Sequence, residues 1–360
     1  MTHASPRRLA STSFRGFLLV VSVAALSIAA LSIAALSIAT VCAPAASATT
    51  LKVATLAPEG SVWDQAYRDM GQAWADGTDG AVTLRLYGGG VAGDEPATVR
   101  KMRIGQLHGA VLTVAGLQVI DPVFAVFEIP MFFDSYAELE HVLDAMRPDF
   151  EQRLDAAGYA MLGWSQAGWV HLFSTEPVRT VDELKTLKLY SWAGDTSTAT
   201  MWRQNGFQPV SVASTDILTG LQTGMLEAVP TTPLAAASLQ WFRQTPYMQD
   251  LGFAPLVGAI MVSKRAFSRL DPVHQKVLRQ AGQTTEDRLF EDVPARDSEA
   301  VAEMSKRGLE VVEVPAEHEQ AWRDAAEIFA DHRRQGLDDK AFLDRVRAVR
   351  DAYRAAHDTP

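Results

Sequence analysis

Hydrophobic and polar positions along the chain predict alternating strands and helices. At residues 81–87 the apolar side chains Val82, Leu84 and Leu86 recur at every second position, which is typical of a half-buried strand. A hydroxyl residue followed three positions later by an acidic one predicts a helix start, and this signal occurs at Ser61, Ser135 and Thr180. Further strands are expected at 51–56, 110–114, 159–164, 170–174, 187–192, 227–229 and 309–314, and further helices at 95–106, 272–307 and 340–356.

The order of these elements predicts an α/β fold with a mainly parallel sheet, because helices joined to strands by short loops form right-handed crossovers. About a dozen elements exceed one ordinary hydrophobic core, so two lobes are expected. The helical segment 272–307 is long enough to run across both lobes, and Pro294 is expected to kink it.

The N-terminal segment has the pattern of a secretory signal. Arg7, Arg8 and Arg15 precede an uncharged apolar run over 17–41, and residues 46–48 (ASA) fit the small-x-small cleavage pattern. Residues 1–48 are therefore expected to be a signal peptide. The alternative is an uncleaved anchor, because a run of about 25 apolar residues is long enough to span a bilayer.

Composition narrows the function classes. The chain is 48% hydrophobic and 21% charged, as in globular proteins. Its net charge is −10, or −13 without residues 1–48, which argues against a nucleic-acid partner. The single cysteine, Cys42, excludes a disulfide framework, and the eight histidines show no metal-ligand spacing. No metal and no cofactor are predicted.

Two glycine-containing motifs do not predict catalysis. Residues 88–93 (GGGVAG) match a dinucleotide-binding loop, but Asp94 and Glu95 follow at once and would repel a pyrophosphate. A glycine turn before an acidic helix start is the favoured interpretation. Residues 163–167 (GWSQA) narrowly miss a nucleophile elbow, and Ser165 is interpreted as a hydroxyl on a strand-edge turn. The protein is not expected to be an enzyme.

Aromatic residues gather in the middle of the chain, several of them at predicted strand ends, where open α/β sheets bind ligands. About half are expected to be core residues. The group comprises Trp164, Trp169, Tyr190, Trp192, Trp202, Trp241, Phe242 and Tyr247.

Several segments resemble, in the same order, the solute receptors of TRAP transporters, the DctP-like family of periplasmic binding proteins. The similar segments are 51–58 (LKVATLAP), 86–95 (LYGGGVAGDE), 99–107 (VRKMRIGQL), 129–133 (IPMFF), 176–189 (EPVRTVDELKTLKL) and 221–227 (LQTGMLE). The resemblance extends from about residue 51 to about residue 309.

This resemblance implies two α/β lobes joined by a hinge, a long helix spanning both, and a ligand held in the cleft between them. Lobe I would comprise 49–168 and 257–297, and lobe II 169–256 and 298–360. It also implies a periplasmic receptor that delivers a small organic ligand to a TRAP-type permease. A monomer is expected by default, and a dimer supported by the C-terminal helix is the alternative. Two alternatives are a sensor-coupled or lipid-shuttling receptor of the same fold and a secreted hydrolase using Ser165.

The chain departs from the family at a position that matters for the ligand. Family members that bind organic acids usually carry an Arg where this chain has Tyr190, and often a second Arg where it has Trp169-Val170-His171. A tyrosine cannot form the charged fork that an Arg makes with a carboxylate. A neutral or amphipathic ligand is therefore expected, with an aromatic wall orienting it.

The alternative is an organic acid held by a substitute base, for which Arg179, Lys188, Arg203 and His171 are the candidates. Thr113 and Thr231 are expected, by their position in the family pattern, to add hydroxyl contacts. The predicted ligand-binding residues are Tyr190, Trp169, Trp192, Thr113, Thr231, Trp164 and Trp241.

Overall fold

The computed structural model describes Met1, residues 48–337 and residues 339–357. The chain divides into two compact units, Met1–Ser47 and Ala48–Pro360. The signal peptide predicted over residues 1–48 therefore falls almost entirely outside the described residues. Within the described part of the chain, no helix combines the length and the apolar character that crossing a membrane requires.

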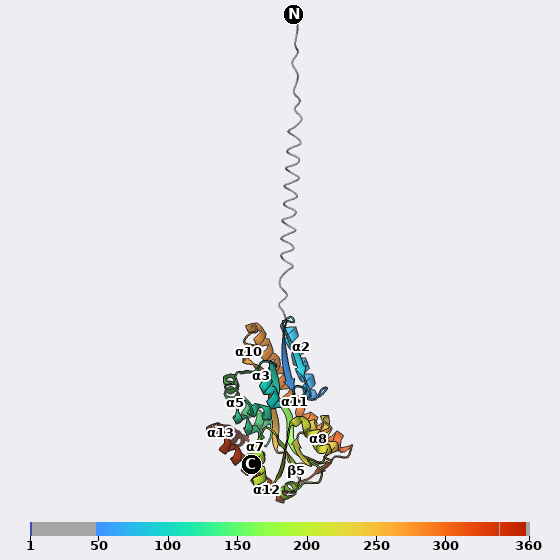
Figure 1. Cartoon of the computed structure of the whole chain (residues 1–360). Helices are drawn as coiled ribbons and strands as arrows, with labels where there is room; N and C mark the ends of the chain where they lie inside the picture. The colour runs from blue at the N-terminus through green and yellow to red at the C-terminus, as the bar shows by residue number, and fades with distance from the viewer. Residues whose placement is uncertain (2–47, 338, 358–360) are drawn as a thin grey trace. The chain divides into compact units, whose positions relative to one another are not determined.

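The second unit contains ten strands and twelve α-helices among its described residues (Figure 1). The strands are β1 (Thr49–Thr55), β2 (Val82–Tyr87), β3 (Gly109–Thr113), β4 (Tyr159–Ser174), β5 (Lys188–Trp192), β6 (Gln208–Val212), β7 (Ala228–Thr231), β8 (Tyr247–Gln249), β9 (Ala254–Ser263) and β10 (Glu310–Val312). The helices are α2 (Val62–Gly77), α3 (Glu95–Arg103), α4 (Val114–Gln118), α5 (Tyr136–Ala156), α6 (Val181–Lys185), α7 (Thr196–Gln204), α8 (Ile217–Gln222), α9 (Pro233–Ser238), α10 (Lys264–Phe267), α11 (Pro272–Ser305), α12 (Ala316–Gly336) and α13 (Lys340–His357). Three 3-10 segments, η1 (Pro122–Glu128), η2 (Ser214–Asp216) and η3 (Trp241–Arg243), complete it.

The predicted helix starts are confirmed by their capping bonds. The hydroxyls of Ser61 and Ser135 each accept a hydrogen bond from the backbone N–H three residues later, at the starts of α2 and α5. Thr180 and Glu183 form a reciprocal capping box at α6. These side chains satisfy backbone N–H groups that have no partner inside the helix.

The sheet is mixed, which corrects the expectation of a mainly parallel one. Its strand order is β2-β1-β3-β9-β4-β7-β5-β6, and β8 pairs with β4 and β10. The outer pairs β1–β2, β1–β3, β5–β6 and β5–β7 are parallel, whereas the central pairs β3–β9, β4–β9 and β4–β7 are antiparallel. The sequence patterns did not reveal β9, the strand that makes the centre antiparallel.

Strand β4 crosses the middle of the sheet. The two strands predicted at 159–164 and 170–174 are one strand of 16 residues. Its first part pairs with β9, and its last residues pair with β7 and β8. The register shifts between Gln166 and Trp169, where Gly168 has a φ of +107°, a conformation that favours glycine.

Helix α11 packs along β4 and contacts both α2 and α9 (Figure 1). Its buried Glu286 accepts the backbone N–H of Trp164 at 2.8 Å and forms an ion pair with Arg147 of α5. Further along, Asp297 accepts the backbone N–H groups of Trp169 and Leu234, each at 2.9 Å. The long helix predicted around Pro294 is thus tied to both parts of β4.

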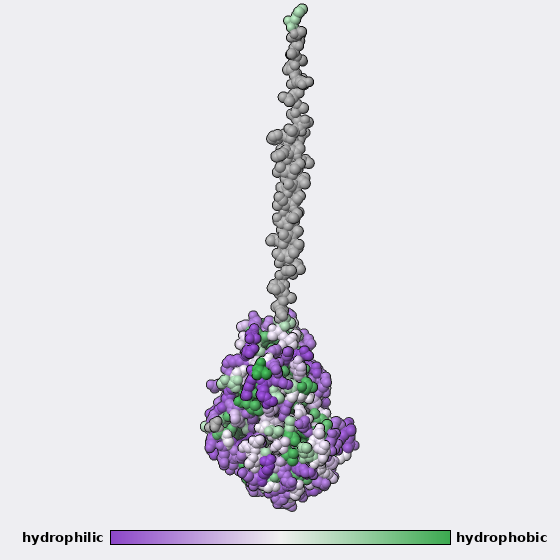
Figure 2. Space-filling view, viewed as in Figure 1, coloured by the Kyte–Doolittle hydropathy of each residue, from purple (hydrophilic) through white to green (hydrophobic). Residues whose placement is uncertain are grey.

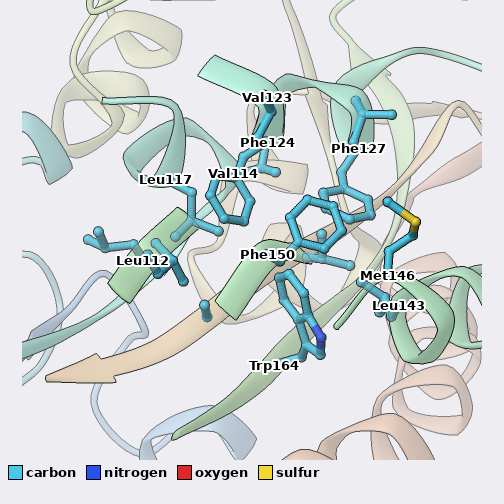
Figure 3. Packing of buried hydrophobic residues seen from close by; sticks show 14 of the residues in the cluster. Leu112, Val114, Leu117, Val123, Phe124, Phe127, Leu143, Met146, Phe150 and Trp164 are labelled. Atoms are coloured by element: carbon cyan, nitrogen blue, oxygen red, sulfur yellow. The ribbon is translucent and has the colours of Figure 1, made fainter. Parts of the chain in front are cut away.

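The largest buried cluster contains a group of packed aromatic rings (Figure 3). Phe124 and Phe127 of η1 pack against Phe150 of α5 and Trp164 of β4. The centroids of the contacting rings are 5.1–6.3 Å apart. Edge-to-face contacts of this kind add stability beyond the burial of apolar area. This core fixes β4 and η1, two elements that also border the cavity described next.

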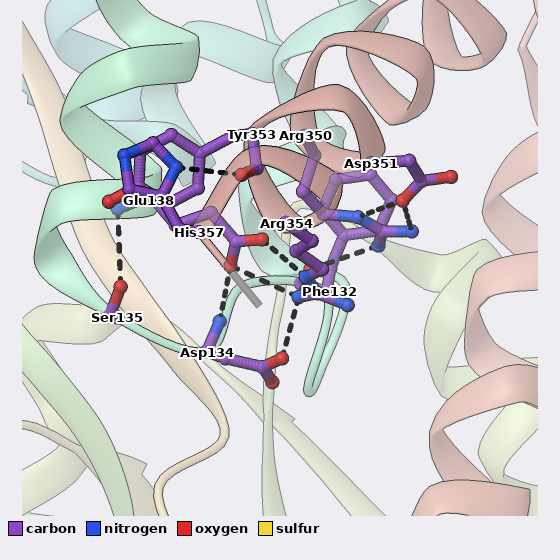
Figure 4. A network of polar contacts seen from close by, with 9 residues as sticks. All are labelled: Phe132, Asp134, Ser135, Glu138, Arg350, Asp351, Tyr353, Arg354 and His357. Atoms are coloured by element: carbon purple, nitrogen blue, oxygen red, sulfur yellow. Dashed lines mark hydrogen bonds and ion pairs between the residues drawn. The ribbon is translucent and has the colours of Figure 1, made fainter. Parts of the chain in front are cut away.

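The C-terminal helix α13 docks on the loop before α5 (Figure 4). Arg354 pairs with Glu138 and Asp134, and Arg350 donates to the carbonyl oxygen of Phe132. On the outer surface, hydrophilic side chains surround apolar patches (Figure 2).

Candidate solute-binding cavity

A cavity of about 420 Å³ is lined by residues from both parallel parts of the sheet and from the central strands β4 and β9. Residues of β1, β3 and α2 line it on one side, and residues of β5, β7 and α12 line it on the other. Most of the lining side chains are aliphatic or aromatic, including Trp63, Phe127, Trp202, Phe253 and Trp322. A cavity of this size and character suits a small organic molecule.

Five of the seven predicted ligand-binding residues line this cavity: Tyr190, Trp192, Thr113, Thr231 and Trp241. Tyr190 and Trp192 are alternate residues of β5, so their side chains point to the same face of the sheet. The hydroxyl oxygens of Tyr190 and Ser214 lie 3.2 Å apart, and the indole N–H of Trp192 donates to Asp94 at 3.2 Å.

Trp164 and Trp169 do not line the cavity. Trp164 is 0% exposed in the aromatic core, because its strand turns that side chain toward η1 and α5 (Figure 3). Trp169 packs edge-to-face on Tyr136, with ring centroids 5.1 Å apart. Its strand is not adjacent to that of Tyr190, because β7 lies between β4 and β5.

Glu95 is a buried carboxyl group behind the cavity wall. It is 2% exposed and accepts hydrogen bonds from the backbone N–H and the hydroxyl of Thr113, at 2.6 and 2.7 Å. Burial raises the pKa of Glu95 to about 7, although the bonds from Thr113 oppose this change. The hydroxyl hydrogen of Thr113 is thereby already engaged, which leaves that oxygen as an acceptor.

The residues around Tyr190 are acidic. Burial raises the pKa of the Tyr190 phenol, and the negative charges of Asp94, Glu95 and Glu128 raise it further. The ring therefore occupies a position where a negative charge would be disfavoured.

One basic side chain, Arg333 of α12, lines the cavity among the described residues, and the sequence analysis did not identify it. It pairs with Glu128 at 2.6 Å and with Asp195 at 2.7 Å. Nothing in the local sequence marks Arg333, because it reaches the cavity only through the packing of α12 against η1 and α7.

The four substitute bases expected from the sequence do not line the cavity. Lys188 pairs with Glu227 at 3.2 Å near the sheet edge, and Arg179 and Arg203 are exposed. Nδ1 of His171 lies 3.0 Å from the carbonyl oxygen of Gln249. Burial lowers the pKa of His171, which favours the neutral imidazole.

The two glycine-containing motifs have structural roles. Gly89, Gly90 and Gly93 have positive φ angles in the turn before α3, and Asp94 caps that helix by accepting the N–H of Glu95. Ser165 lies within β4, not on a strand-edge turn, and its hydroxyl is 2.7 Å from that of Tyr67. A nucleophile elbow requires a strand-to-helix turn at the serine, which β4 does not provide.

The described residues contain no group of three or more His, Cys, Asp or Glu side chains suited to a metal ion.

Comparison with known proteins places this fold among extracytoplasmic receptors. DctP7, a Bordetella pertussis extracytoplasmic solute receptor binding pyroglutamic acid, superposes with a TM-score of 0.77 at 21% identity, covering 84% of this chain and 100% of that one. The sugar acid binding protein DctPAm of Advenella mimigardefordensis, in complex with galactonate, gives a TM-score of 0.80 at 16% identity, covering 85% and 98%. These likenesses establish the two-lobe fold.

Relatives found by sequence are equally distant. A solute-binding protein of Sulfitobacter sp. NAS-14.1 is 23% identical over 67% of this chain and 74% of its own length. The uncharacterized protein YiiZ of Salmonella typhimurium is 21% identical over 59% of this chain, which spans 65% of that relative.

The family model that describes the bacterial extracellular solute-binding proteins of family 7 (DctP) matches residues 53–333. Proteins of this family are extracytoplasmic solute receptors of TRAP transporters, not enzymes, and they work with a membrane permease. The chain belongs to the DctP family of bacterial extracellular solute-binding proteins.

Proposed function

We propose that this receptor binds a small neutral or amphipathic organic solute in the 420 Å³ cavity and delivers it to a TRAP-type permease as a monomer. The observation that carries the proposal is the character of the cavity wall, which is mostly aromatic and aliphatic. Burying a ligand against such a wall is favourable for apolar surface and unfavourable for an unpaired charge.

The surroundings of Tyr190 support the same ligand class. A carboxylate placed at this ring would meet the acidic side chains named above, and the phenol would offer it one neutral hydrogen bond. A neutral group has no such charge repulsion, and the Tyr190 hydroxyl is able to orient it by donating or accepting.

A second candidate is an organic acid, with Arg333 as the substitute base. Arg333 lines the cavity, and the structural neighbours named above bind pyroglutamic acid and galactonate. For this candidate a ligand carboxylate would have to compete with Glu128 and Asp195 for the guanidinium.

We propose the lobe boundaries expected from the sequence, with 49–168 and 257–297 in one lobe and 169–256 and 298–360 in the other. The register shift of β4 around Gly168, whose φ is positive, and the change of its partner from β9 to β7 a few residues later support a hinge in this part of the strand. Contacts from Asp94 to Trp192 and Ser214, at 3.2 and 3.4 Å, would then join the closed lobes.

Thermal shifts of residues 49–360 against a divided ligand panel test the proposal. One half would contain organic acids, including sugar acids, and the other neutral aromatic, sterol-like and lipid-like compounds. A ligand at about 100 times its Kd stabilises the folded state by about 2.7 kcal/mol, which is a shift of several degrees. Stabilisation by the neutral half supports the proposal, whereas stabilisation by acids alone would favour the second candidate.

A further inference from the structure

The charged residues of the cavity form one cluster drawn from three separate elements. Arg333 lies in the last turn of α12, Glu128 ends η1, and Asp195 caps α7. Nη2 of Arg333 is 2.6 Å from Oε2 of Glu128, and Nη1 is 2.7 Å from Oδ2 of Asp195. The Arg333 side chain is only 12% exposed, so both pairs are held in a poorly solvated place.

Two carboxylates on one guanidinium give the cluster a net negative charge. Burial raises the pKa of Glu128 and the nearby charge of Asp195 adds to this, while Arg333 opposes both. Burial also acts to raise the pKa of Asp195, but Arg333 and the hydrogen bonds from Thr198 outweigh it, so that pKa is lowered. A ligand carboxylate would be a third negative group sharing the same guanidinium at short range.

We infer that Glu128 and Asp195 are specificity residues that exclude carboxylate ligands, because both pair with Arg333 and their two negative charges outweigh its single positive charge. The inference rests on the proposed function, since it requires the solute to bind in this cavity. The ligand class that fits is a molecule with an apolar body and an uncharged hydrogen-bonding end, such as an amide or an alcohol. The N–H or O–H of such a group is able to donate to the two carboxylates.

Matched pairs of compounds that differ only in charge test this directly. Octanoic acid and octanamide form one pair, and 2-naphthoic acid and 2-naphthamide another, each measured by calorimetry at pH 7. The unaltered protein should prefer the amide of each pair. Glu128→Gln and Asp195→Asn should each raise the acid-to-amide affinity ratio about tenfold or more, because each releases one charged hydrogen bond of Arg333.

Both substitutions preserve shape, and Asn keeps the capping role of Asp195 at α7. Two controls isolate the charge of the cluster. In the double variant Glu128→Gln with Arg333→Gln, the gain in acid affinity should disappear, because the guanidinium is gone. Glu227→Gln removes an acid that pairs with Lys188 outside the cavity lining, and it should leave the ratio unchanged.

An unchanged ratio in both single variants would overturn the inference while leaving the proposed neutral ligand intact. An unaltered protein that prefers the acids would overturn both the inference and the proposed ligand class. If no compound of either pair binds any of the folded variants, the result contradicts the proposal that this cavity binds an apolar solute. The inference, which rests on that proposal, is then contradicted as well. Circular dichroism melting of each variant confirms that it is folded before binding is measured.

Discussion

At the scale of single residues, Glu95 links the cavity wall to the stability of the fold. Its carboxyl group is buried and bonded to Thr113, and its pKa is raised from the ordinary 4.5 to about 7. A raised pKa in the folded state means that folding favours the protonated acid. The contribution of Glu95 to stability is therefore complete below about pH 4.5 and is lost as the pH rises to about 7.

We expect Glu95→Gln to remove this pH dependence, because an amide stays neutral across the window. At about 1.4 kcal/mol per pKa unit, the wild-type protein should lose on the order of 3 kcal/mol relative to Glu95→Gln between pH 4.5 and 7.5. Urea unfolding of both proteins at four pH values measures the difference. Thr113→Val removes one hydrogen bond to the carboxylate and should move the window to higher pH. If the free energy of unfolding depends on pH in the same way in the wild type and in Glu95→Gln, the raised pKa of Glu95 is contradicted.

The site could be predicted from the sequence only where a residue belongs to a recognisable local pattern. Tyr190 and Trp192 lie in a short strand directly after a segment that resembles the family, and both line the cavity. Trp164 was expected to line the cavity too. An indole packs equally well in a hydrophobic core and against a ligand, and the sequence does not show toward which of the two the side chain points. Arg333 could not be found, because it lies more than a hundred residues from its partners and its role depends on tertiary packing.

At the scale of elements, the register shift of β4 depends on a glycine at a crowded position. Gly168 has a φ of +107°, and a Cβ atom added there would lie 2.1 Å from Oδ2 of Asp297. That oxygen accepts the backbone N–H of Trp169, so it cannot move without breaking the bond between α11 and β4. Both backbone strain and a steric clash therefore oppose any larger residue at Gly168.

We expect Gly168→Ala to destabilise the fold more than Gly158→Ala. Gly158 also has a positive φ, +90°, but no atom lies within 4 Å of the added Cβ, so its substitution costs backbone strain alone, about 1–3 kcal/mol. The clash with Asp297 should add at least about 1 kcal/mol at Gly168. Chemical unfolding of the two variants under the same conditions measures the difference. Equal losses of stability in the two variants would show that Asp297 can move away from the added methyl group without a measurable loss of the contact between α11 and β4.

Among elements, the helices that begin with a hydroxyl–acid capping signal were predicted, whereas α12, which begins without a side-chain cap, and several short helices were not. Capping residues such as Ser61, Ser135 and Thr180 act locally, so a helix start can be recognised from a few neighbouring positions. Strand β9 is buried along almost its whole length and shows no alternation of apolar and polar residues, which removes the signal that identified β2. The join between the two predicted parts of β4 was missed because its glycine looks like a turn in the sequence.

At the scale of the whole molecule, the proposed closing of the lobes depends on contacts that cross the cavity. Asp94 caps α3 on one side, and its Oδ2 accepts the indole N–H of Trp192 from β5 at 3.2 Å. The backbone N–H of Ser214 approaches the same oxygen at 3.4 Å. If these contacts form only in the closed state, they shift the equilibrium between open and closed protein toward the closed state. A ligand that binds the closed state then binds more tightly, because a larger fraction of the protein is ready to bind it.

We expect Trp192→Phe and Asp94→Ser each to weaken solute binding about tenfold, because each removes a hydrogen bond to a charged group from the closed state. Phe keeps an aromatic ring in the cavity wall, and Ser keeps the cap of α3 while being too short to reach β5. Calorimetry with a compound that stabilises the unaltered protein gives the affinities, and small-angle X-ray scattering gives the size of the ligand-free molecule, which should increase.

The double variant decides whether the two side chains act through one contact. If Asp94 and Trp192 stabilise closure through their shared hydrogen bond, combining the substitutions should cost little more than either alone. A loss equal to the sum of the two single losses would mean that each residue acts independently, Trp192 as part of the wall and Asp94 as a helix cap. Unchanged size and affinity in all three variants would show that closure does not depend on this contact.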